Sequence, residues 1–127
     1  MLLQHSIEPQ PEGKVVVDHK EYTLVQSDYS WKGDNIEINT KSSPDINELA
    51  DMFKTLEVKK GDTVTLEIER NPSSITAIKL NEDGTSDNVE IKDNKMIMPS
   101  EDGYYIYKLK TRWDNGRETF VFDVNVK

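Results

Sequence analysis

The chain has 127 residues, of which 16 are Lys or Arg and 24 are Asp or Glu, so its formal net charge is −8. This length suits one domain around one core. The chain contains no cysteine, which excludes a disulfide framework, a thiolate zinc site and a cysteine nucleophile. The excess of acids argues against a nucleic-acid partner, for which a basic surface would be expected. The low mean hydropathy leaves no stretch long and apolar enough to cross a bilayer.

The N-terminal residues lack the features of a secretory signal peptide. Met1, Leu2 and Leu3 are followed directly by polar residues, without a basic segment or an apolar segment of signal-peptide length. This pattern indicates either a cytosolic protein or one whose leader has been removed. Residues 8–13 are polar and rich in proline, which is typical of a tether. We therefore expect a flexible lead-in over residues 1–13 and a single β-sandwich domain over residues 14–127.

The first part of the domain predicts a hairpin and a further strand. Residues 15–17 and 22–25 are rich in β-branched and aromatic residues, and residues 18–21 between them are suited to a turn. In residues 35–39, Ile36 and Ile38 alternate with polar residues. This alternation predicts a strand with one buried face.

One segment has helical periodicity instead. Ile46, Leu49, Ala50 and Phe53 fall at positions i, i+3, i+4 and i+7, which places them on one face of a helix. The preceding residues 43–45 are Ser, Pro and Asp, a combination of capping residue, helix-starting proline and acid. The segment predicts a short amphipathic helix over residues 44–54 that crosses between the sheets.

Strand patterns return after the predicted helix. Residues 56–58 lead through a turn at 59–62 into a strand over residues 63–69, and a further strand is predicted over residues 88–91.

A Gly-Tyr motif near residue 103 predicts the start of a long strand. Asp102 and Gly103 precede Tyr104, Tyr105 and Tyr107. This order resembles the tyrosine corner of immunoglobulin-like sandwiches, with Tyr107 where antibody domains carry a cysteine. On this interpretation Tyr105, Tyr107 and Leu109 point into the core, and a role in packing is favoured over a catalytic tyrosine.

The last part of the chain predicts a hairpin and a closing strand. Asp114-Asn115-Gly116 lies between Trp113 and Arg117, and its Asn-Gly pair tolerates the positive φ of a tight turn. Alternation in residues 119–126 predicts a final strand with one buried face. Together the patterns predict an all-β, immunoglobulin-like sandwich of about seven to nine strands with one short crossing helix.

Two segments raise the question of a metal site. Residues 81–90 are rich in oxygen ligands, but with Gly84 at the sixth position of a calcium loop, the obligatory first acid falls on Lys79. Met96 and Met98, with His5 and His19, suggest soft copper ligands. A solvated turn is favoured for the first segment and a core strand for the methionines. We therefore predict no metal and no cofactor.

Motifs of common enzymes are missing. The sequence contains no Gly-x-Ser-x-Gly, phosphate loop or dinucleotide fingerprint, so a non-enzymatic protein is predicted.

Tyr29, Trp31 and Trp113 are the candidate ligand-binding residues, because exposed aromatic rings on a sandwich can stack on a sugar or peptide. The alternative, which is favoured, is that Trp31 fills the core and Trp113 covers its edge. Lys108 and Lys110 alternate with Tyr107 and Leu109, a pattern that would discourage pairing at an edge strand and so favours a monomer.

Several of these segments together resemble a known group of proteins. They are Tyr29-Ser30-Trp31, Ser43-Pro44 with the following helix, Asn71-Pro72-Ser73, residues 99–107, Trp113-Asp114-Asn115-Gly116 and Phe120-Val121-Phe122. Over residues 14–127 the chain resembles small extracytoplasmic β-sandwich modules of Gram-positive bacteria, found as lipoproteins and as sensor domains of membrane metallopeptidases. The lipid-bearing cysteine of that family is missing here. Similar Gly-x-Tyr and closing-strand patterns occur in a bacterial intracellular proteinase inhibitor of immunoglobulin-like fold.

The resemblance implies two functions of different class. The first is a non-enzymatic binding or sensing module, tethered at the cell surface, with an unidentified protein, peptide or glycan ligand and with membrane contact only through a lipid anchor. The alternative is a proteinase inhibitor that presents a loop to a protease. An enzyme remains an option only if an apolar pocket contains converging Asp or Glu side chains.

Overall fold

A computed structural model describes residues 11–33, 36–40 and 45–127 and places eleven strands and one short helix among them. In chain order these elements are β1 (Gly13–Val17), β2 (Lys20–Thr23), β3 (Val25–Gly33), β4 (Ile36–Thr40), α1 (Ile46–Asp51), β5 (Leu56–Val58), β6 (Thr63–Ile68), β7 (Ser74–Leu80), β8 (Ser86–Val89), β9 (Lys95–Ile97), β10 (Gly103–Trp113) and β11 (Gly116–Val126). No helix among these residues is long and apolar enough to span a membrane.

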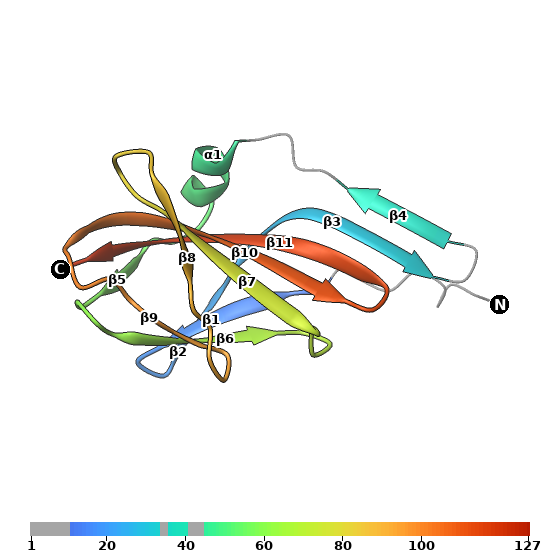
Figure 1. Ribbon diagram of the computed structural model, residues 1–127, viewed down its shortest axis with the longest axis horizontal. Coiled ribbons are helices and arrows are strands. Elements are labelled where there is room, and N and C mark those ends of the chain that lie inside the picture. The colour runs from blue at the N-terminus through green and yellow to red at the C-terminus, as the bar shows by residue number, and fades with distance from the viewer. Residues whose placement is uncertain (1–10, 34–35, 41–44) are drawn as a thin grey trace.

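The strands form a two-layered all-β sandwich, as the sequence predicted, with more strands than expected (Figure 1). The smaller sheet has the order β2-β1-β6-β9, and the larger has the order β4-β3-β11-β10-β7-β8. β5 runs parallel to the end of β11. β6 and β9 pair in one sheet while β7, β10 and β11 are neighbours in the other, which matches the division of B and E strands from C, F and G strands in immunoglobulin domains.

The core lies between the two sheets. It combines aliphatic residues of the smaller sheet with aromatic residues of the larger one, and its fully buried members include Val15, Val64, Tyr107, Phe120 and Phe122. The predicted inward positions of β10 are confirmed, because Tyr105, Tyr107 and Leu109 are all buried. The Tyr105 hydroxyl donates to the Glu101 carbonyl oxygen at 3.0 Å, which is the hydrogen bond of a tyrosine corner.

The helix differs in extent and in position from the expectation. It spans Ile46–Asp51, and its N-cap is Asp45, whose Oδ1 accepts from the Glu48 amide at 3.0 Å. Ser43, the expected cap, lies outside the described residues. The helix links β4 and β5, both in the larger sheet, and packs on the outer face of that sheet instead of crossing between sheets (Figure 1).

This position of α1 changes the burial of β11. The strand buries Phe120, Phe122, Val124 and Val126 in the core as predicted, but outward-facing residues of the same strand are also buried. Val121 is covered because it packs with Leu49 and Ala50 of α1. The outer face of the larger sheet is therefore apolar under the helix and polar beyond it.

Two turns differ from their predicted form. The first hairpin pairs Val17 with Lys20, so its loop is only Asp18-His19, both with positive φ, instead of residues 18–21. The last hairpin pairs Trp113 with Gly116, so its loop is Asp114-Asn115. Neither loop residue has a positive φ, and neither does Gly116. Gly116 is suited to its position by close approach, because an added Cβ would lie 2.4 Å from Trp31 Cε3.

The described part of the chain starts shortly before the expected domain boundary. β1 begins at Gly13, one residue before Lys14. The preceding residues are already bonded to the domain: the Pro11 carbonyl accepts from Gln26 Nε2 at 2.7 Å, and the Glu12 amide donates to Glu69 Oε1 at 2.7 Å. Residues 1–10 of the expected lead-in lie outside the described residues.

Candidate functional site

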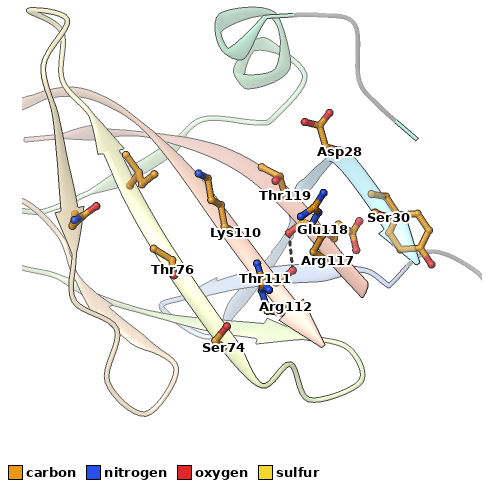
Figure 2. A pocket seen from close by; sticks show the side chains of 13 residues that line it. Asp28, Ser30, Ser74, Thr76, Lys110, Thr111, Arg112, Arg117, Glu118 and Thr119 are labelled. Carbon is orange, nitrogen blue, oxygen red and sulfur yellow. Dashed lines mark hydrogen bonds between the residues drawn. The ribbon is translucent and has the colours of Figure 1, made fainter. Parts of the chain in front are cut away.

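A hollow of about 640 Å³ lies on the outer face of the larger sheet, beside the part that α1 covers. Figure 2 shows that its labelled side chains come from β3, β7, β10 and β11. Its lining residues are Asp28, Tyr29, Ser30, Ser74, Thr76, Ile78, Asn88, Lys110, Thr111, Arg112, Arg117, Glu118 and Thr119. Most of the exposed side chains in this set are cations and hydroxyls.

Strand register places these side chains in two rows across the sheet. In the first row Arg112 lies opposite Arg117 on β11 and opposite Ser74 on β7, and Arg117 lies opposite Ser30 on β3. In the second row Lys110 lies between Thr76 and Thr119. Residues directly opposite on antiparallel strands have Cβ atoms about 4.5–5.5 Å apart, so the two arginines start from neighbouring points on a rigid surface.

The three cations of the hollow have no acidic partner in the described part of the chain. The ion pairs there are Lys14–Glu21, Lys79–Asp87 and Lys127–Glu57, and none involves Lys110, Arg112 or Arg117. Asp28 is the one exposed acid among the lining residues. Like charges directly opposite on adjacent strands are destabilising, so the Arg112–Arg117 pair is unfavourable for the isolated domain.

The register of the arginines is fixed from the other face of the sheet. Thr111 and Glu118 are opposite each other between the rows, and both are buried. The Thr111 hydroxyl donates to the Glu118 carbonyl oxygen at 2.8 Å, as the dashed line in Figure 2 marks. This bond holds β10 and β11 together next to the cations.

The structure brings the three predicted aromatic residues together at one end of the sandwich. The Tyr29 and Trp31 rings are 6.2 Å apart with planes at 19°, and the Trp31 and Trp113 rings are 5.8 Å apart. Tyr29 and Trp113 are buried, and Trp113 Nε1 donates to the Glu69 carbonyl at 3.3 Å. Only Trp31 is partly exposed, and the Arg70 guanidinium lies 5.4 Å from its ring centroid. A stacking ligand would therefore have to bind to the part of Trp31 that Arg70 leaves uncovered.

The segments considered for metal binding have structural roles in the described residues. Residues 81–85 form the turn between β7 and β8, where Asp83 Oδ1 accepts from the Thr85 amide at 2.9 Å and Asn81 Nδ2 donates to Thr85 Oγ1 at 2.9 Å. Met96 and Met98 are in the core. His5 lies outside the described residues. Across the portion of the chain that is described, no three His, Asp or Glu side chains gather as metal ligands.

Sequence reasoning missed the hollow because it assigned the lysines of β10 to an edge. β10 lies between β11 and β7, so Lys108 and Lys110 are on a central strand and cannot protect an edge. The monomeric state remains a prediction, but edge protection by these lysines no longer supports it. The signal was present as alternating outward cations at positions 108, 110 and 112, and it became interpretable once the hairpin register was known.

Comparison with known proteins adds no family. No protein-family model matches the chain, and no curated protein matches it. The chemistry of the site is that of cations without an acidic partner among the described residues, beside hydroxyl donors on the outer face of a β-sandwich.

Proposed function

We propose that this protein is a non-enzymatic, extracytoplasmic binding or sensing module that takes up an anionic ligand in the hollow on the outer face of its larger sheet. The observation that carries the proposal is the opposed pair Arg112 and Arg117, with Lys110 beside it and no acidic partner for any of the three in the described residues. An anion bound between the arginines would relieve their mutual repulsion.

The charge of the rest of the molecule supports a small ligand. The net charge is −8, so an extended polyanion would be repelled by most of the surface while contacting one basic area. A compact anion can bind within the hollow alone. The cations lie on central strands, which hold their backbone positions more firmly than loops do.

The composition of the lining supports binding over catalysis. Its exposed polar groups are suited to donate hydrogen bonds to an anion. Of its two acids, Asp28 is exposed and Glu118 is buried, whereas acid–base chemistry would be favoured by carboxylates that converge in the hollow.

The extracytoplasmic location rests on the resemblance of residues 14–127 to tethered sandwich modules. Protease added to intact source cells tests it. Digestion of the protein in intact cells is expected, whereas protection until the cells are lysed would contradict a surface location.

Calorimetric titration at low salt with citrate, inorganic phosphate, sulfate and acetate tests the binding function. We expect saturable binding of at least one multivalent anion and its loss in the double variant R112Q/R117Q. The control is K14Q/K127Q, which removes the same number of positive charges from exposed ion pairs elsewhere and should bind normally. Failure of every anion to bind, or equal binding by R112Q/R117Q, would overturn the proposal.

A further inference from the structure

We infer that the hollow is built for a phosphate monoester, that is, for a phosphoryl group attached to an organic part. This inference rests on the proposed binding function and names its ligand class. It follows from three properties of the hollow: the number of available donors, the local charge and the volume.

The available donors exceed what one carboxylate can accept. Arg112 and Arg117 each carry a fork of N–H groups, and Lys110 carries an ammonium. The hydroxyls of Ser74, Thr76 and Thr119 line the same hollow, and none of them makes a side-chain hydrogen bond to another described residue. A carboxylate offers two oxygens, whereas a phosphoryl group offers three strong acceptor oxygens at different heights above the sheet.

The local charge also matches a phosphoryl group. The exposed lining residues include three cations and one acid, Asp28, which is an excess of two positive charges among the exposed side chains. The second acid of the lining, Glu118, is buried. A phosphate monoester carries about −1.5 to −2 at pH 7, while a carboxylate carries one negative charge. Arg112 and Arg117 lie side by side, so both forks can reach one tetrahedral group, and Lys110 starts two residues from Arg112 on the same face.

The volume leaves room for more than phosphate. The hollow measures about 640 Å³, within the range of about 300–1,000 Å³ that is usual for small-molecule sites. From the cations the hollow extends over Thr76 to Ile78 on β7 and to Asn88 on β8. Ile78 and Asn88 are opposite each other in the β7–β8 register. Ile78 offers an apolar contact and Asn88 a polar one. We place the organic part of the ligand on this side.

Calorimetry and amide chemical-shift mapping with phenyl phosphate, inorganic phosphate and benzoate test the inference on the intact chain. We expect phenyl phosphate to bind at least about tenfold more tightly than benzoate, which is about 1.4 kcal/mol. The largest amide shifts should fall on β7, β10 and β11. Binding should be lost in R112Q/R117Q and retained in the charge-matched K14Q/K127Q.

Two further variants separate geometry from charge. R112K/R117K keeps both charges but replaces two planar forks by point charges, and it should weaken phenyl phosphate several-fold while leaving benzoate nearly unchanged. Ile78→Ala should weaken phenyl phosphate and leave inorganic phosphate unchanged. Circular dichroism of each variant establishes that it is folded.

The outcomes distinguish this inference from the function on which it rests. If benzoate or citrate binds as tightly as phenyl phosphate, the inference that the hollow is built for a phosphate monoester is wrong, and the anion-binding function stands. If inorganic phosphate binds as tightly as phenyl phosphate, the inference that the hollow also binds an organic part of the ligand is wrong. If no anion binds, both the inference and the proposed function fail.

Discussion

Tyr107 and Phe122 lie directly opposite each other on β10 and β11, and their rings stack with centroids 4.9 Å apart and planes 9° apart. Phe53, which follows α1, packs against Phe122 at 6.0 Å between ring centroids. Tyr107 occupies the position at which antibody domains carry a core cysteine. In this cysteine-free chain, an aromatic stack between neighbouring strands of the larger sheet therefore lies where antibody domains place one end of their disulfide.

Two tyrosine-to-phenylalanine changes on β10 should have different effects on stability. Tyr107→Phe removes a fully buried hydroxyl that has no hydrogen-bond partner in the described residues, so we expect unchanged or higher stability, by up to about 1 kcal/mol. Tyr105→Phe removes the bond to the Glu101 carbonyl and should cost about 1 kcal/mol. Urea unfolding of both variants measures the difference. A larger loss for Tyr107→Phe would contradict this account of the two hydroxyls.

The alternation of apolar residues was sufficient to predict the fold class. It identified the core face of β11 and the inward tyrosines of β10, because alternation reports directly which side of a strand is buried. It could not place α1, because the apolar face of a short helix packs equally well between sheets or on an outer face. The burial of Val121 follows from that placement.

The position of the cations in the site depends on which two residues form the loop between β10 and β11. A loop centred on Asn115-Gly116 would place Asp114 opposite Arg117, which suggests an ordinary ion pair. The observed loop, Asp114-Asn115, places Arg112 opposite Arg117 instead. Strand order was equally decisive, because the same lysines have different roles on an edge strand and on a central strand. One sequence does not determine either feature.

Replacing Gly116 should disturb the aromatic cluster. In Gly116→Ala the new Cβ would lie 2.4 Å from Trp31 Cε3 and 2.5 Å from the Ser30 carbonyl oxygen, so β3 must move away from β11. We expect a loss of about 1–3 kcal/mol and a change in tryptophan fluorescence, measured by urea unfolding. Asn115→Ala, in the adjacent exposed loop, is the control and should change neither. Unaltered fluorescence and stability in Gly116→Ala would show that β3 is not packed as described.

Stability should fall in alkali, and Tyr107 should contribute. Burial raises the pKa of Tyr107 above its ordinary value of 10.0, so the folded chain keeps a proton that the unfolded chain releases. The stabilisation is complete below about pH 10 and decreases as the pH rises towards the folded pKa, by about 1.4 kcal/mol per pH unit. Tyr107→Phe lacks this decrease. Its stability relative to the parent should be constant below about pH 10 and increase above it, as measured by urea unfolding at each pH. Parallel pH profiles of the two proteins would contradict the predicted contribution.

The binding function and the inhibitor alternative differ in an assay with proteases. An inhibitor of the alternative type presents a projecting loop to the protease, whereas the hollow is concave and lies on strands. We therefore expect no stoichiometric inhibition of trypsin-like, chymotrypsin-like or subtilisin-like enzymes at micromolar protein. Residual activity measured after preincubation checks this, with gel analysis to establish that the protein itself stays intact. Stoichiometric inhibition that persists in R112Q/R117Q would place the function in a loop and favour the inhibitor. Inhibition that disappears in R112Q/R117Q would instead mean that the protease itself binds through an acidic surface at the hollow.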